Sequence, residues 1–249
     1  MEIDTSLKRK LFLKEMGIEP EWLPKNAVTI VENPAKGETP TTSVKSPIQI
    51  PTVHAPSGTS TATTSAMDWD TLEQTVSSCQ RCQLCSTRTQ TVFGTGPHNA
   101  EWMVIGEAPG EQEDRQGQPF VGQAGKLLDN MLYAIGLNRT QNVYIANILK
   151  CRPPENRNPH PEEIADCAPY LQRQIALLQP KCILLMGRFA AQTLLKTDVS
   201  ISKLRGQVYF YENIPTIVTY HPAYLLRSPQ EKGKAWIDLC MAKNFMQTD

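Results

Sequence analysis

The sequence lacks an excess of charge of either sign, since 25 lysines and arginines face 25 aspartates and glutamates. This balance excludes a uniformly basic protein, although a local basic face for nucleic acid is compatible with it. No apolar run approaches the roughly 20 residues that a membrane helix needs. The first residues, Met-Glu-Ile-Asp-Thr-Ser, lack the basic and apolar regions of a secretory signal. We therefore expect a cytoplasmic protein without membrane contact.

Composition divides the 249 residues into three expected parts. Residues 1–25 contain a short helical candidate whose apolar stripe includes Phe12 and Met16. A helix of this length cannot bury its apolar stripe by itself. We therefore expect it to pack on the main domain or on a partner. Residues 26–67 are rich in Thr, Ser and Pro, which is typical of a disordered linker. Residues 68–249 are expected to form the folded domain.

The third part alternates short β-rich runs with helical patterns. The runs lie at 102–105, 143–147, 182–187 and 217–221, and the helical patterns at 124–136, 161–178 and 188–196. This alternation predicts an α/β fold with a mostly parallel sheet and helices on both faces. A further helix, capped by Asp68 or Asp70, is expected to end at the first cysteines.

Polar residues follow the strands at the edge where parallel sheets bind their ligands. They are Gly106, Glu107, Asn147, Gly187, Arg188 and His221. A stiff Ala-Pro-Gly loop after the first strand leads to three carboxylates and an aromatic ring, at Glu111, Glu113, Asp114 and Phe120. Acid groups and one aromatic ring on a rigid loop indicate a site. The alternative is a solvated acidic loop beside a buried phenylalanine.

Seven cysteines in a reducing compartment favour metal binding or catalysis over disulfides. Three stand close together, at Cys79, Cys82 and Cys85, and two more follow at Cys151 and Cys167. Paired thiols two residues apart suit a chelating turn, and distant thiols can complete a four-thiolate site. Free buried thiols are the alternative, and spacing does not separate zinc from an iron–sulfur cluster. The remaining two, Cys182 and Cys240, are interpreted as small buried hydrophobic residues.

Three motifs resemble the family 4 uracil-DNA glycosylases, the iron–sulfur branch of their superfamily. They are Gly106-Glu-Ala-Pro-Gly-Glu-Gln-Glu-Asp with the following Gly-Gln-Pro-Phe-Val-Gly, Asn147-Ile-Leu-Lys-Cys-Arg-Pro-Pro-Glu-Asn-Arg, and His221-Pro-Ala-Tyr-Leu-Leu-Arg. The resemblance covers about residues 69–244. It implies a three-layer α/β/α domain with a mostly parallel central sheet.

The resemblance also implies a cofactor and a reaction. A [4Fe–4S] cluster would be held by Cys79, Cys82, Cys151 and Cys167, with Cys85 surplus to the pattern. The reaction would be hydrolysis of the bond between uracil and deoxyribose in DNA, after the base has been flipped out of the stack. No lysine is placed to act as a Schiff-base nucleophile, so an abasic site without strand cleavage is expected.

Three residues of the motifs would handle the flipped base. The resemblance implies that Phe120 stacks on the uracil ring and that His221 stabilises the negative charge growing on O2. Asn147 offers a carbonyl and an amide that match N3–H and O4 of uracil, whereas cytosine presents the opposite pattern.

Further roles follow from the same motifs. Glu107 would orient the attacking water, and Glu113 and Asn156 match family positions important for the site. The backbone of Ala108, Pro109 and Gly110 would hold uracil O2 and a nearby phosphate. A leucine at Leu225 or Leu226 would enter the gap left by the base. Phosphate contacts are expected from Arg188, Lys203, Arg205 and Arg227.

The N-terminal peptide suggests a partner. Residues 7–22 resemble the peptide of the DNA polymerase III psi subunit that docks onto the chi subunit, and the alternative is a helix that folds back on the glycosylase domain. Two functions are therefore weighed: a monomeric uracil-DNA glycosylase, and an inactive replication accessory protein of the same fold. The intact motif residues favour the enzyme.

Overall fold

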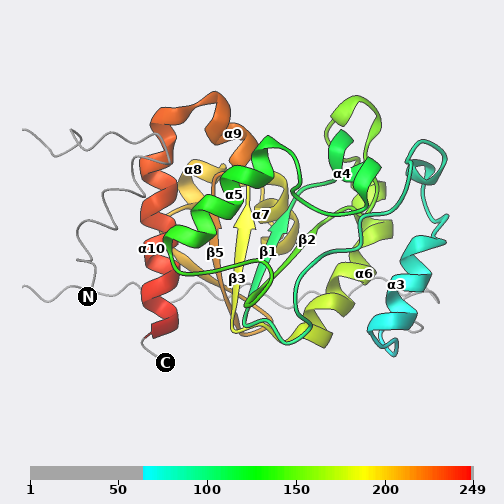
Figure 1. Ribbon diagram of the computed structural model, residues 1–249, viewed down its shortest axis with the longest axis horizontal. Coiled ribbons are helices and arrows are strands. Elements are labelled where there is room, and N and C mark those ends of the chain that lie inside the picture. Colours follow the sequence, from blue (N-terminus) through cyan, green and yellow to red (C-terminus); the bar gives the residue numbers. More distant parts are fainter. Residues whose placement is uncertain (1–63, 248–249) are drawn as a thin grey trace, which may run out of the picture.

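The computed structural model describes residues 64–247, which build one sheet covered by helices on both faces (Figure 1). The strands are β1 (Trp102–Gly106), β2 (Val143–Asn147), β3 (Cys182–Met186), β4 (Val208–Tyr211) and β5 (Ile214–Thr219). Their order is β2-β1-β3-β5-β4, with every pairing parallel except that of β4 with β5. The predicted three-layer α/β/α fold with a mostly parallel sheet is confirmed.

Two groups of helices form the outer layers. One face of the sheet is covered by α3 (Trp69–Ser77), α6 (Pro161–Leu178) and α7 (Arg188–Leu195). The other is covered by α5 (Gln123–Ala134), α9 (Pro222–Arg227) and α10 (Lys232–Gln247). Short elements lie in the connections: η1 (Gln83–Ser86), α4 (Glu111–Gln116), η2 (Pro154–Asn156), α8 (Ile201–Leu204) and η3 (Pro229–Glu231).

The central strands are apolar on both faces because each face supports its own core. Met103 and Ile105 of β1 pack in the core with α3 and α6, whereas Trp102 and Val104 pack in the core with α5 and α10. Successive side chains of a strand point to opposite faces, so a strand buried on both sides reads as a continuous apolar run. This is why these strands could be found from sequence.

Two local predictions had different outcomes. Helix α5 begins at Gln123, close to the predicted start. The segment after Gly110 was expected to continue as an acidic loop, which is wrong, since residues 111–116 form α4. Its carboxylates occupy the first helical turn, where the partial positive charge of the helix N-terminus favours them, and Glu113 reaches back to the Gly110 N–H.

The N-terminal part of the domain begins as expected. Asp68 caps α3 by accepting a hydrogen bond from Thr71 N at 2.9 Å, and the helix ends just before Cys79. Within residues 64–247, no helix is long and apolar enough to cross a membrane. The docking peptide of residues 7–22 and almost all of the linker at 26–67 lie outside the described residues, so both stay predictions.

One buried ion pair joins α8 to α10. Arg205 Nε donates to Asp238 Oδ2 at 2.7 Å, and the two side chains are only 11% and 0% exposed. The guanidinium also donates to the Lys234 carbonyl and stacks over the Tyr220 ring at 4.6 Å. The structure does not favour the expected contact of Arg205 with DNA phosphates, because its side chain is largely buried and its Nε and Nη2 atoms already donate inside the protein.

We predict that Arg205→Met lowers the free energy of unfolding by about 3–5 kcal/mol, because it leaves the Asp238 carboxylate buried without its partner. The double variant Arg205→Met with Asp238→Leu should recover most of this loss, since it removes both charges. Urea denaturation of the three proteins tests the prediction. A single variant as stable as the wild type would show that the pair contributes nothing.

Candidate active site

The ends of β1 and β2 bring an amide and an aromatic ring together. Gly106 and Asn147 are register partners at the carboxyl ends of these strands. A Cβ added to Gly106 would overlap with Asn147 Oδ1 and would lie 2.7 Å from Phe120 Cζ. Only glycine leaves room for both side chains here, so the amide and the ring converge over its Cα.

His221 completes this cluster from the end of β5. Its ring stacks near Phe120, with a centroid distance of 5.4 Å and an angle of 30° between the planes. A Cβ at Gly187, at the end of β3, would lie only 2.9 Å from His221 Cβ. Four parallel strands thus converge on Phe120, Asn147 and His221, at the edge where such sheets bind ligands.

The amide of Asn147 is prepared for a ligand. Its side chain is 2% exposed, and within residues 64–247 its Oδ1 has no hydrogen-bond partner. A buried acceptor without a donor costs about 1–3 kcal/mol. The fold accepts this cost at the position where the resemblance implies that uracil N3–H is read.

The tautomer of His221 follows from its position at the start of α9. Nδ1 accepts a hydrogen bond from Ala223 N at 3.1 Å, so the neutral ring carries its proton on Nε2. The pKa of His221 is lowered to about 4, chiefly by burial and secondly by Arg227, against an opposite effect of Glu113. At neutral pH the residue is therefore an uncharged imidazole that can donate from Nε2.

Glu113 holds the loop that carries Phe120. Its Oε1 accepts from Val121 N at 2.9 Å and from Gly122 N at 3.1 Å, while Oε2 accepts from Gly110 N at 3.1 Å. Both carboxylate oxygens are thus bonded to backbone N–H groups. This geometry assigns Glu113 a positioning role, in contrast to a direct part in the reaction.

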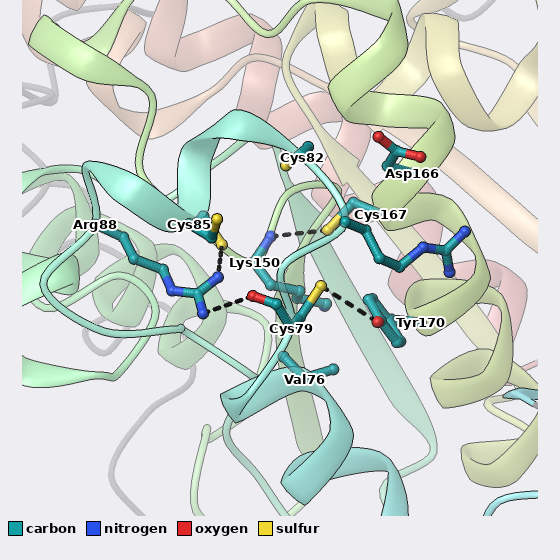
Figure 2. A pocket seen from close by; sticks show the side chains of 11 residues that line it. Val76, Cys79, Cys82, Cys85, Arg88, Lys150, Asp166, Cys167 and Tyr170 are labelled. Carbon is teal, nitrogen blue, oxygen red and sulfur yellow. Dashed lines mark hydrogen bonds between the residues drawn. The ribbon is translucent and has the colours of Figure 1, made fainter.

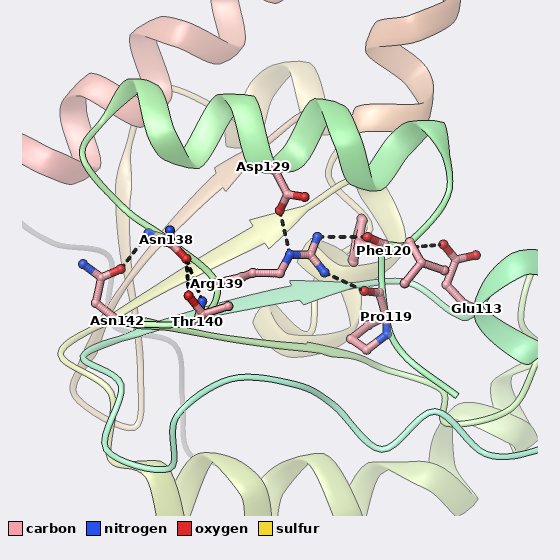
Figure 3. A network of polar contacts seen from close by, with 9 residues as sticks. Glu113, Pro119, Phe120, Asp129, Asn138, Arg139, Thr140 and Asn142 are labelled. Carbon is pink, nitrogen blue, oxygen red and sulfur yellow. Dashed lines mark hydrogen bonds and ion pairs between the residues drawn. The ribbon is translucent and has the colours of Figure 1, made fainter. Parts of the chain in front are cut away.

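Arg139 supports the same loop from its other side (Figure 3). Its guanidinium donates to Pro119 O at 3.2 Å and to Phe120 O at 2.9 Å, and Nε is paired with Asp129 at 2.6 Å. Phe120 has a φ of 54°, which a bulky residue adopts only when its surroundings impose it. Sequence reasoning missed Arg139, because no local motif connects it with a loop nineteen residues away.

The Ala-Pro-Gly loop offers fewer backbone donors than expected. Pro109 has no N–H, and that of Gly110 is already donated to Glu113. Of the three expected positions, only Ala108 is left as a backbone donor for a ligand. Glu107, which precedes it, is half-buried, and burial raises the pKa of its carboxyl group while Arg188 opposes this rise.

Two further sequence predictions are not met by the geometry. Asn156 is exposed in η2, where its Oδ1 accepts from Arg152 Nε at 2.8 Å, and no described hydrogen bond or ring contact links it to the cluster. Leu225 is 1% exposed and packs in the core, so it is not available to enter DNA. Leu226 is 44% exposed. The basic residues Arg188, Lys203 and Arg227 are also exposed.

Five cysteines surround a second site (Figure 2). A cavity open to solvent is lined by Cys79, Cys82, Cys85, Cys151 and Cys167. Three of their sulfurs accept hydrogen bonds: Cys151 from Arg88 at 3.0 Å, Cys79 from the Tyr170 hydroxyl at 3.3 Å, and Cys167 from Lys150 N at 3.3 Å. Burial raises the pKa of the Cys167 thiol to about 12.

The donor set of this cavity suits thiolates. Hydrogen-bond donors aimed at sulfur stabilise the deprotonated form, which is the form that binds metal. Within the described part of the chain, no group of three or more His, Cys, Asp or Glu side chains is arranged to hold a metal ion.

Comparison with known proteins identifies the class of this protein. Residues 93–243 match the family model of the Uracil DNA glycosylase superfamily. The chain is 46% identical over 169 residues to a type-4 uracil-DNA glycosylase of Archaeoglobus fulgidus, covering 65% of this chain and 84% of the relative. A type-4 enzyme of Sulfurisphaera tokodaii is 46% identical over 167 residues, which are 64% and 76% of the two chains. One of Thermotoga maritima is 38% identical over 182 residues, covering 72% and 94%.

The chain therefore belongs to the uracil-DNA glycosylase superfamily. Membership of this superfamily implies binding of uracil-containing DNA.

We predict that His221 remains neutral down to about pH 4 in the folded protein, whereas it takes up a proton near its ordinary pKa of 6.5 when unfolded. The unfolded state then binds more protons between these values, so the free energy of unfolding falls as pH falls from about 6.5 to 4. The variant His221→Gln should lack this component.

Ring nitrogen NMR measures the pKa and the tautomer directly. Arg227→Gln should raise the His221 pKa but leave it below 6.5, because burial is the larger cause. A pKa at its ordinary value, or a proton on Nδ1, would contradict the prediction.

Proposed function

We propose that the chain is a monofunctional uracil-DNA glycosylase, which hydrolyses the N-glycosidic bond of deoxyuridine in DNA and leaves an abasic site. The observation that carries this proposal is the buried, unpartnered Oδ1 of Asn147 beside the rings of Phe120 and His221. An amide, an aromatic face and a neutral N–H donor suit an uncharged planar base. The relatives, which are named as glycosylases, favour the enzyme over an inactive accessory protein.

Base selection follows from the donor and acceptor pattern. Uracil must leave the stack before a protein can reach its glycosidic bond. The Phe120 ring would stack on the flipped base, while Asn147 Oδ1 accepts from N3–H and its amide donates to O4. Cytosine has an acceptor at N3 and a donor at C4, so it would leave the buried Asn147 oxygen unpaired.

Bond cleavage develops negative charge on the departing uracil. His221 would donate from Nε2 to O2, and the hydrogen bond from Ala223 keeps its ring in the required tautomer. Glu107 would orient the water that attacks the sugar carbon and would oppose the positive charge of the sugar in the transition state. Glu113 contributes indirectly, by fixing the Phe120 loop.

Contacts with the DNA backbone are proposed for the exposed residues at this edge. Leu226 is the leucine that can fill the gap left by the flipped base, because Leu225 belongs to the core. Arg188, Lys203 and Arg227 are proposed to bind phosphates. A local set of this kind supplies positive charge in a protein whose total charge is zero.

For the cysteine cavity we propose a [4Fe–4S] cluster held by Cys79, Cys82, Cys151 and Cys167. Its chemistry there would be structural: four iron–thiolate bonds tie together the segment before η1, the segment after β2 and helix α6. Arg88, Tyr170 and Lys150 support the proposal, since each donates a hydrogen bond to one of these sulfurs.

The activity is tested with an oligonucleotide that contains one uracil, treated with alkali after incubation to cleave abasic sites. The wild type should produce cleavage, and His221→Ala should lower the rate about 10²–10³-fold through loss of one donor to the leaving group. Lys181→Ala, at the opposite edge of the sheet, is the control with unchanged rate. No cleavage by the wild type, or an unchanged rate in His221→Ala, would refute the assignment.

The metal site is tested by iron content. Protein purified without oxygen should be brown and contain about four iron atoms per chain. Cys151→Ser should lose this iron, whereas Cys85→Ser and the control Cys240→Ser should keep it. Colourless protein that contains zinc would refute the cluster, and loss of iron in Cys85→Ser would change the assigned ligand set.

A further inference from the structure

Lys150 is a charged residue inside the core. It lies between Asn147 and Cys151 in sequence, and only 1% of its surface is exposed. Isolated buried charges are rare because the loss of hydration must be offset by hydrogen bonds or by a charged partner. A lysine in this place therefore calls for an explanation that the glycosylase reaction, as described above, does not supply.

The ammonium group has two neutral acceptors. Lys150 Nζ donates to Gln174 Oε1 at 2.6 Å and to the Asn147 carbonyl at 3.0 Å. In residues 64–247, no carboxylate lies within ion-pair distance of it. Burial lowers the pKa of this ammonium to about 8, and the nearby thiols of Cys167 and Cys151 oppose that fall.

Gln174 is itself held in a fixed orientation. Its residue is 0% exposed, and Nε2 donates to Phe93 O at 2.9 Å and to the Tyr144 hydroxyl at 3.2 Å. Its Oε1 therefore has to face Lys150. Gln174 stands two turns after Cys167 on α6, so one helix carries both a proposed cluster ligand and the acceptor for the ammonium.

The two ends of Lys150 reach the two sites of the protein. Its backbone N–H donates to Cys167 Sγ in the cysteine cavity, which Lys150 also lines (Figure 2). Its side chain bonds the carbonyl of Asn147, the residue whose amide faces the base. Oδ1 of Asn147 has no partner within the described chain, so the backbone that carries this amide is held by its pairing with Gly106 and by the bond from Lys150.

We infer that Lys150 is a positioning residue that couples the cysteine cavity to base recognition: its backbone N–H holds the Cys167 sulfur, and its ammonium fixes the peptide of Asn147. The inference rests on the proposed glycosylase function and adds to it a buried residue that touches neither DNA nor base.

The test compares the wild type with Lys150→Met, which keeps the length of the side chain but removes its charge and donors. The control is Lys181→Met, an exposed lysine paired with Glu101 at the amino edge of the sheet. Four quantities are measured on the iron-loaded proteins: the reduction potential of the cluster, inhibition by free uracil, the kinetics on uracil-containing DNA, and the binding of undamaged DNA.

Lys150→Met should give a more negative potential, because a positive charge near the cluster favours the added electron. Inhibition by free uracil should weaken, and kcat should fall about 10²-fold, because the Asn147 amide that binds the base is displaced. Binding of undamaged DNA should not change, since phosphates are bound elsewhere. The control should match the wild type in every measurement.

A folded Lys150→Met protein with unchanged potential, or with unchanged uracil inhibition and kcat, would overturn the inference. If this variant does not fold, Gln174→Met carries the test, since it removes one acceptor and keeps the charge. It should weaken uracil inhibition without making the potential more negative, and unchanged inhibition would overturn the inference. An inactive wild type would instead refute the proposed function itself.

Discussion

The close approach over Gly106 is the constraint on which the rest of the site depends. Parallel pairing sets Gly106 beside Asn147, and the missing Cβ admits both the amide and the Phe120 ring. Sheet register alone would leave these groups on separate elements. With glycine at the strand end, three segments far apart in sequence meet around one small volume, and His221 joins them from β5.

Hydrogen bonds connect both Asn147 and the Phe120 loop with the segments that line the cysteine cavity. On one side, Lys150 connects Cys167 with the carbonyl of Asn147. On the other, Thr89 N, four residues after Cys85, donates to both carboxylate oxygens of the buried Asp114 at 3.0 Å. The next residue towards the N-terminus of α4 is Glu113, which holds the Phe120 loop. A rigid cavity would therefore restrain both the aromatic face and the amide.

The sequence could predict those structural features that depend on a few neighbouring residues. Four of the strands, the cap Asp68 and the polar strand ends follow from apolar runs and single residues. The edge strand β4 was missed, because its residues are only partly buried and show no clear pattern. The support from Arg139 and the burial of Leu225 rather than Leu226 depend on how helices pack, which spacing within a motif does not encode.

The three groups that we propose to contact the base, Phe120, Asn147 and His221, are uncharged, and for His221 the fold explains why. A protonated His221 would lose its hydrogen bond from Ala223 and would bring a second positive charge near Arg227. A neutral donor avoids both costs and still points at the place where charge develops. Positive charge lies instead on exposed side chains such as Arg188, Lys203 and Arg227, which we propose as phosphate contacts. Separating the charges in this way lets an uncharged base enter a pocket that a phosphate would not favour.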